Sequence, residues 1–256
     1  MIFHESIEFL GHKIENNRIS ISTKTNDAIK SYPVPKTKRQ LKKFLGMANW
    51  RRKYISKFAM ITEPLVALLR KDSKFYFGKK EIEALDCVKR ALLEAPALNQ
   101  PIEGLPYVIY SDASLTGIGG YLAQEDGDRT LVIEYASRRI KPCEFSYSVY
   151  QLELLAVVFL CNQFTKYILG REITIYSDNK ALTYAKTERN LDPRTTRLLL
   201  KLQRYNLKFK HVKGEENIIA DTLSRFPPED QDNEENKEFM VNQISSNFKD
   251  DFLEMC

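Results

Sequence analysis

The sequence lacks the cysteine patterns of a disulfide framework or a zinc site. Its four cysteines include no CxxC pair, so we expect reduced intracellular thiols. No apolar run is long enough for a transmembrane helix, because the longest, Leu152 to Cys161, is far too short to cross a bilayer. The first residues lack a basic start followed by an apolar core, so no secretory signal is expected. We therefore expect an intracellular protein, not a secreted or membrane-bound one.

Two common kinds of catalytic machinery are also missing. The sequence shows no glycine-rich loop that could cradle phosphates and no Ser/His/Asp arrangement for nucleophilic catalysis. What remains is an ordinary globular composition over 256 residues, enough chain for one or two domains with a buried core. Any chemistry must therefore come from other side chains.

The charge is unevenly distributed along the chain. From Pro227 onward there are two basic and nine acidic residues, a net of −7, which leaves +12 for residues 1–226 because the whole chain carries +5. A body this basic suggests a polyanionic partner such as nucleic acid, although a solvated surface of lysine and arginine explains the charge equally well. The acidic segment 227–256 has little apolar periodicity and is expected to be a disordered linker.

The first hundred residues read as two pieces. Residues 1–22 predict a two-stranded hairpin with a turn at Asn16-Asn17, a unit too small to be stable alone. Residues 23–102 predict short helices, with Thr37 as an N-cap and Pro96 and Pro101 closing the segment. Basic and aromatic side chains crowd the helix after Thr37, which indicates either contact with a phosphate backbone or a charged outer face of a packing helix.

Residues 103–226 read as one α/β unit. We expect strands at 107–110, 118–123, 131–136, 172–176 and 207–212. Between the third and fourth strands a long helix is predicted, from about Ser148 to Leu169, ending at Gly170. Short helices are expected from Asn179, from Asp192-Pro193 and from Asn217 to Ser224. The order is three strands, helix, strand, helices, strand, helix.

Glu153 is the most informative single residue. It lies in a predicted helix that is apolar on nearly every side and hence buried. An ionised carboxylate there costs several kcal/mol unless it is paired or binds a metal. A buried arginine partner or a raised pKa is the alternative, but no partner is evident nearby in the sequence. We therefore favour a role as a metal ligand.

Three further carboxylates occupy comparable positions. Asp112 and Asp178 follow predicted strands, and Asp221 lies on the last predicted helix. Taken singly, Asp112 fits an ordinary turn residue, Asp178 a helix N-cap and Asp221 an exposed helical aspartate. Taken with Glu153, they can converge at one edge of a sheet, where only cations would offset their repulsion. Oxygen ligands of this kind select Mg²⁺ or Mn²⁺, and two such ions about 4 Å apart support displacement at phosphorus.

His211 lies ten residues before Asp221, after the last predicted strand. A mobile histidine beside a metal site can move a proton during product release, whereas a lone histidine is more often structural. The glycines that follow Asp112, namely Gly117, Gly119 and Gly120, are expected to keep the edge low enough for a nucleic-acid backbone.

The motifs together resemble a known family. YSDAS with GIGGYLAQ, then YSVYQLELLAVV, TIYSDNKAL and HVKGEENIIADTLSR, resemble the ribonuclease H domain of gypsy-type LTR-retrotransposon reverse transcriptases. Upstream, EFLGHKI, PVPKTKRQLKKFLGMANWRRKYISKFAMITEPL and EAPAL resemble the end of the palm and the thumb of the same polymerases. The resemblance covers about residues 5–226 in family order. The polymerase aspartate pair does not occur, so this chain alone is not expected to polymerise DNA.

The resemblance implies a function and a site. It implies an α/β ribonuclease H-like fold, a mixed five-stranded sheet flanked by helices, preceded by a small helical thumb-like subdomain. The implied domains are residues 1–22 (palm end, with FLGH resembling the primer grip), 23–102 (thumb), 103–226 (ribonuclease H) and 227–256 (linker). The implied metal-binding catalytic set is Asp112, Glu153, Asp178 and Asp221, with His211 where ribonucleases H carry a catalytic histidine. The residues expected to contact nucleic acid are Lys38, Arg39, Lys42, Lys43, Trp50, Arg51, Arg52, Asn179 and Asn217.

The predicted activity is hydrolysis of the RNA strand of RNA/DNA hybrids with two Mg²⁺ or Mn²⁺ ions, inside a retrotransposon Pol polyprotein. The expected partners are the hybrid and the remaining polymerase domains, and a homodimer is also compatible with the sequence. The expected location is cytoplasmic particles or the nucleus. Two alternatives stay open: a catalytically inert nucleic-acid-binding remnant, and an integrase or transposase of the same fold.

Overall fold

The computed structural model describes residues 6–71, 73–184 and 192–212. The predicted helix from Asn217 to Ser224 and the predicted acidic linker 227–256 lie outside these residues. None of the helices described is long and apolar enough to cross a membrane. The three cysteines that the structure describes, Cys87, Cys143 and Cys161, are free thiols.

The first part of the chain forms a small antiparallel sheet and a set of short helices. Its elements are β1 (Ser6–Phe9), β2 (His12–Glu15), β3 (Arg18–Ile21), α1 (Thr23–Lys30), α2 (Lys38–Trp50), η1 (Arg52–Tyr54), α3 (Phe58–Ile61), α4 (Glu63–Ala67), α5 (Lys79–Leu93) and β4 (Leu98–Asn99). The sheet order is β1-β2-β3-β4. Thr37 caps α2 as predicted, accepting a hydrogen bond from the backbone N–H of Gln40 at 3.2 Å.

The predicted two-stranded hairpin is wrong in one respect, because residues 6–15 contain a turn of their own. Leu10 and Gly11 have positive φ angles of 50° and 79°, and they connect β1 to β2. Asn16 and Asn17, with φ of 48° and 61°, form the predicted second turn. Asparagine adopts this left-handed conformation more readily than leucine, so the sequence indicates the second turn more clearly than the first.

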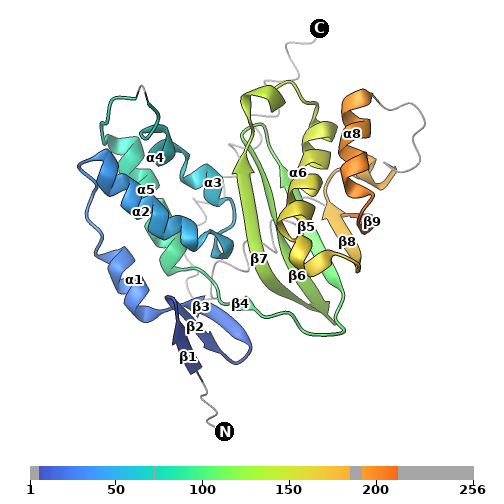
Figure 1. The fold of residues 1–256 in the computed structure, drawn as a ribbon, viewed down its shortest axis with the longest axis horizontal. Coiled ribbons are helices and arrows are strands. Elements are labelled where there is room, and N and C mark those ends of the chain that lie inside the picture. The colour runs from blue at the N-terminus through green and yellow to red at the C-terminus, as the bar shows by residue number, and fades with distance from the viewer. Residues whose placement is uncertain (1–5, 72, 185–191, 213–256) are drawn as a thin grey trace, which may run out of the picture. The chain divides into compact units, whose positions relative to one another are not determined.

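The second part of the chain forms the expected mixed sheet with helices. Its elements are β5 (Tyr107–Ala113), β6 (Gly117–Asp126), β7 (Arg129–Arg139), η2 (Pro142–Glu144), α6 (Val149–Gln163), α7 (Thr165–Ile168), β8 (Glu172–Ser177), η3 (Lys180–Tyr184), α8 (Pro193–Leu202) and β9 (Asn206–His211). The sheet order is β7-β6-β5-β8-β9 (Figure 1). Strands β7, β6 and β5 are antiparallel neighbours, whereas β5, β8 and β9 run parallel.

Local signals explain most boundaries in this part. Gly127, at φ 60°, begins the tight connection of β6 to β7. Ser148 caps α6, and Asp192 caps α8, accepting from the N–H groups of Arg194 and Thr195 at 2.9 and 3.1 Å. The predicted long helix divides at Phe164 into α6 and α7, and the chain turns at Gly170, which has a φ of 77°.

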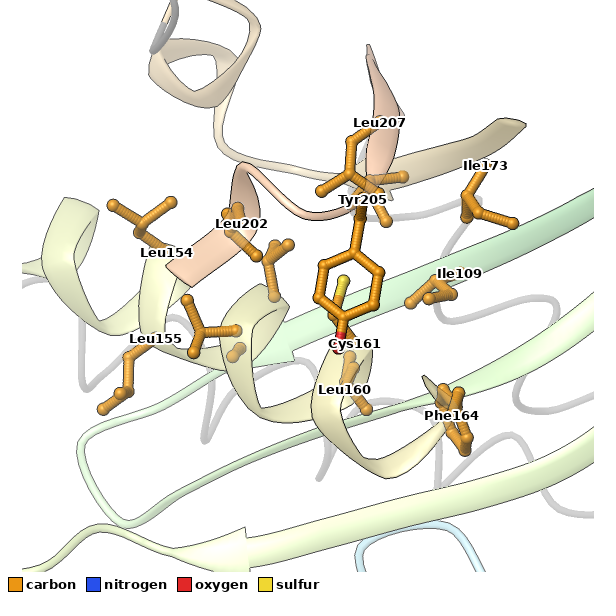
Figure 2. Packing of buried hydrophobic residues seen from close by; sticks show 14 of the residues in the cluster. Ile109, Leu154, Leu155, Leu160, Cys161, Phe164, Ile173, Leu202, Tyr205 and Leu207 are labelled. Atoms are coloured by element: carbon orange, nitrogen blue, oxygen red, sulfur yellow. The ribbon is translucent and has the colours of Figure 1, made fainter. Parts of the chain in front are cut away.

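One face of the large sheet is covered by α6, with α8 beside it (Figure 1). The core on this side is made of aliphatic residues of α6 and the strands, closed by Leu202, Tyr205 and Leu207 (Figure 2). On the other face, Tyr121 and Tyr135 are buried in a second hydrophobic cluster together with residues of the helical part. Both parts therefore belong to one compact unit, and the predicted domain boundaries stay predictions.

Candidate carboxylate site at the ends of three parallel strands

The parallel arrangement of β5, β8 and β9 brings three predicted site residues to the same edge of the sheet. Asp112 is the next-to-last residue of β5, Asp178 directly follows β8, and His211 is the last residue of β9. The register pairs Tyr110 with Tyr176, and Ser177 with His211. Because parallel strands end at the same edge, side chains that are distant in sequence become neighbours there.

Glu153 reaches this edge from α6. The side chain is buried, with the residue only 4% exposed, and the residues around it on the helix are buried apolar ones. Ser177 Oγ donates a hydrogen bond of 3.5 Å to Glu153 Oε2, and the backbone N–H of Ala113 also stabilises the carboxylate. The predicted buried position of Glu153 is confirmed, and no arginine or lysine forms an ion pair with it among the described residues.

The three carboxyl groups affect one another. Burial, and then the negative charges of Asp178 and Asp112, raise the pKa of Glu153 to about 8. Partial desolvation of its carboxyl group and the charge of Asp112 raise the pKa of Asp178, while His211 acts in the opposite direction. The geometry therefore assembles negative charge that the described side chains neutralise incompletely.

Asp178 does not act as the N-cap of the following short helix, because Asn179 has that role. The Asn179 side-chain oxygen accepts a hydrogen bond from the N–H of Ala181 at 2.9 Å, at the start of η3. Ser177 Oγ in turn accepts from the N–H of Asn179 at 3.1 Å. Asn179 thus has a structural role at the site, and its predicted contact with nucleic acid stays a prediction.

The donor set fits a hard divalent cation in its chemistry. Three neighbouring carboxylates, two of which have a raised pKa, provide the negative oxygen ligands that Mg²⁺ and Mn²⁺ prefer. Among the described residues, however, no group of three His, Cys, Asp or Glu side chains has the geometry of a formed metal site. The predicted fourth ligand, Asp221, and the predicted contact Asn217 lie outside the described residues.

One cation at the site was missed by the sequence analysis. Lys57 Nζ lies 3.3 Å from Asp112 Oδ2, and both side chains are about half exposed. Lys57 precedes α3 in the helical part, far from Asp112 in sequence. No local signal distinguishes it from the many other basic residues of that segment, because the contact depends on how the chain folds back.

The glycines after Asp112 have a different role from the predicted one. A Cβ on Gly117 would lie 2.6 Å from the Met60 sulfur, and one on Gly119 would lie 2.9 Å from the carbonyl oxygen of Ala136. A Cβ on Gly120 would lie 2.0 Å from the carbonyl oxygen of Tyr110. The prediction that they clear space for nucleic acid is wrong, because protein atoms already occupy that space.

The predicted nucleic-acid residues of the helical part divide into exposed and buried ones. The exposed ones are Arg39, Lys42, Lys43, Trp50 and Arg52, while Lys38 is half-buried and donates to the carbonyl oxygen of Arg70. Helix α2 meanwhile buries Leu41, Phe44 and Ala48, so it is both a packing helix and a basic surface. Arg52 also lines a groove with Arg138 and Arg139 of β7.

Arg51 is buried, unlike its neighbour Arg52. Its guanidinium donates to the carbonyl oxygen of Met47 at 2.9 Å and to the Thr25 hydroxyl at 3.1 Å. A phosphate contact by Arg51 would require it to leave these partners. The structure therefore gives Arg51 a role in joining α1 to the end of α2.

The part of the chain that contains the large sheet matches a known protein family. Residues 103–205 match the family model of the RNase H-like domain found in reverse transcriptase. The chain is 32% identical over 240 residues to the Pol polyprotein of transposon 297 and 31% identical over 236 residues to that of transposon gypsy, both of Drosophila melanogaster. These alignments cover 93% and 87% of the chain, and 22% of each polyprotein. The transposon Tf2-3 polyprotein of Schizosaccharomyces pombe is 30% identical over 261 residues, which is 98% of the chain and 19% of that polyprotein.

Solved structures show the same fold. A foamy viral protease-reverse transcriptase in complex with double-stranded DNA superposes with a TM-score of 0.71 at 22% identity, over 83% of this chain and 38% of that one. The foamy viral protein in complex with an RNA/DNA hybrid gives a TM-score of 0.69 at 22% identity, over 90% and 31%. At this identity the likeness establishes the fold alone.

The five-stranded sheet with its helices is thus an RNase H-like fold, as predicted. Residues 103–205 match the RNase H-like domain found in reverse transcriptase, and the chain is homologous over most of its length to Pol polyproteins of gypsy-type and Tf2 transposons. It spans about a fifth of the length of these relatives.

Proposed function

We propose that this protein hydrolyses the RNA strand of RNA/DNA hybrids, as the ribonuclease H part of a retrotransposon Pol polyprotein. The observation that carries the proposal is the burial of Glu153 beside Asp112 and Asp178. A fold has little reason to keep an unpaired carboxylate in its core unless the charge is used, since burying it is unfavourable. The match of residues 103–205 to the RNase H-like domain found in reverse transcriptase supports this reaction class.

The proposed ligands are Asp112, Glu153, Asp178 and Asp221, with Mg²⁺ or Mn²⁺ as the cations. When bound, divalent cations supply an activated water and neutralise charge on the phosphate, which are the requirements for hydrolysing a phosphodiester. The products would carry 5′-phosphate and 3′-hydroxyl ends. The chain's own contribution is to fix Glu153 rigidly through α6, while Asp112 and Asp178 approach from strand ends.

His211 is proposed to move a proton. It lies half-buried at the end of β9 and is paired in register with Ser177. It is also close enough to Asp178 to lower the pKa of that aspartate. From there an imidazole nitrogen can take a proton from water or return one to the leaving oxygen as products depart. Exposed residues of α2 and Arg52 are proposed to hold the hybrid's phosphates, consistent with their position on a basic surface.

The test uses the full chain with Mg²⁺ and a hybrid labelled on its RNA strand. We expect internal cleavage of the RNA, and we expect Asp112→Asn to abolish cleavage while keeping hybrid binding. Asp126→Asn is the matched control, because Asp126 is an exposed aspartate at the opposite end of the same hairpin. Binding without cleavage by the unaltered protein would indicate an inert remnant, and preferential cutting at DNA ends would indicate the integrase class. Either result overturns the proposal.

A further inference from the structure

The helical part of the chain contributes a cation to the carboxylate site. Lys57 Nζ lies 3.3 Å from Asp112 Oδ2, within ion-pair distance. This contact joins the segment before α3 to the end of β5.

Contacts independent of the ion pair hold this segment against the sheet. The backbone N–H of Ala59 donates to Ser137 Oγ at 3.1 Å, and Arg139 Nη1 donates to Glu63 Oε1 at 2.7 Å. Met60 packs so closely on Gly117 that a Cβ there would lie 2.6 Å from its sulfur. The docking of α3 therefore holds Lys57 where its ammonium group can reach Asp112.

The backbone of Lys57 is itself unusual. It adopts the left-handed conformation, with φ 52° and ψ 24°, immediately before α3. Residues other than glycine and asparagine rarely adopt this conformation, because it brings Cβ too close to a backbone carbonyl oxygen. Asparagine would fit this backbone conformation better than lysine, so the presence of lysine indicates a role for its ammonium group.

We propose that Lys57 is a tethered counter-ion of the carboxylate site that competes with divalent cations for Asp112. The proposal rests on the proposed function, because it assumes that Asp112 is a metal ligand. In the metal-free protein the ammonium offsets part of the negative charge at the edge of the sheet. A dication bound at Asp112 would repel it, so Lys57 must swing away when metal binds, and its half-exposed side chain has room to do so.

The consequence is a lower metal affinity than the carboxylates alone would give. A half-exposed ion pair of this kind contributes at most about 1 kcal/mol. Its removal should therefore strengthen divalent binding about two- to fivefold. The effect should shrink as salt is added, since salt screens interactions between exposed charges.

The test measures Mn²⁺ binding to the full chain by isothermal titration calorimetry without nucleic acid, so it does not depend on activity. We expect Lys57→Gln and Lys57→Asn to bind Mn²⁺ about two- to fivefold more tightly than the unaltered protein, and Lys57→Arg to bind it with unaltered affinity. The matched control is Lys208→Gln, because Lys208 forms a comparable exposed ion pair with Glu172, whose strand β8 begins at the opposite end of the sheet.

The variants separate charge from backbone strain. Lys57→Gln removes the charge and keeps an unfavourable residue in the left-handed conformation, whereas Lys57→Asn also relieves the strain. Tighter binding by Lys57→Asn alone, or an equal gain in Lys208→Gln, would overturn the proposal. So would equal Mn²⁺ affinity in all variants. If the unaltered protein and every variant bind no divalent cation, the proposed function fails first, and with it the assumption on which this inference stands.

Discussion

Replacing Glu153 by glutamine should stabilise the metal-free protein at neutral and alkaline pH. Glutamine has nearly the same shape as protonated glutamate, so the substitution removes a buried charge and leaves the packing of α6 unchanged. Glu153 is the group to alter because it is the most buried of the site carboxylates and its pKa is raised to about 8 by burial and by the charges of Asp178 and Asp112.

The sign and size of the effect follow from the two pKa values. In the folded state the carboxyl holds its proton up to about pH 8, whereas in the unfolded chain it loses it near its ordinary value of 4.5. Between these values the folded state binds more protons, so the stability of the unaltered protein falls as pH rises, by about 1.4 kcal/mol per pH unit. Below pH 4.5 the carboxyl is protonated in both the folded and the unfolded state, so Glu153 causes no loss of stability there. At pH 8 the loss approaches about 4 kcal/mol, a large part of the stability of a typical domain.

The assay is urea unfolding followed by circular dichroism at pH 5, 6, 7 and 8 in EDTA. The free energy of unfolding of Glu153→Gln minus that of the unaltered protein should rise steadily across this range. Glu172→Gln, which alters an exposed glutamate, should give a flat difference within about 0.5 kcal/mol. Adding Mg²⁺ at pH 8 should stabilise the unaltered protein more than the variant, because a ligand stabilises the state that binds it. A difference that does not change with pH would refute the reasoning.

Two further predictions concern the fold around the site. Gly120→Ala should destabilise the protein by about 3 kcal/mol or more, because the new Cβ would lie 2.0 Å from a backbone oxygen of Tyr110. The control in urea unfolding is Gly46→Ala, whose Cβ would meet no atom within 4 Å, and equal losses in the two variants would contradict the steric argument. Arg51→Ala should lower the free energy of unfolding by about 1–3 kcal/mol, because it removes the hydrogen bonds to Met47 and Thr25. Arg52→Ala should change the free energy of unfolding by less than about 0.5 kcal/mol and weaken hybrid binding, as measured by fluorescence anisotropy. The reverse pattern would show that the two arginines were assigned to the wrong roles.

The carboxylate site could be predicted because its signals are local. Glu153 is surrounded in sequence by apolar residues, so its burial follows from the helix alone. Asp112 lies at the end of β5 and Asp178 directly follows β8, and parallel strands bring their ends together. These inferences need only secondary structure and the direction of each strand.

The contacts that were missed depend on how distant segments pack. Lys57 meets Asp112 only because α3 docks on β7, and nothing near Lys57 in the sequence indicates it. The burial of Arg51 and the exposure of Arg52 depend on the chain turning from α2 into η1 at that point. The space around Gly117 is filled by Met60, a residue of a different part of the chain. Composition and periodicity carry no information about such contacts.

The site combines one rigid carboxylate with two adaptable ones. Glu153 cannot move without disturbing α6, whose side chains form much of the core, so the burial that raises its pKa also fixes its position. Asp112 is half exposed and Asp178 is exposed, so both can adjust to a ligand. A site that must hold reacting groups to within a fraction of an ångström needs at least one fixed reference point. The unfavourable burial of Glu153 is therefore inseparable from the precision that we propose it provides.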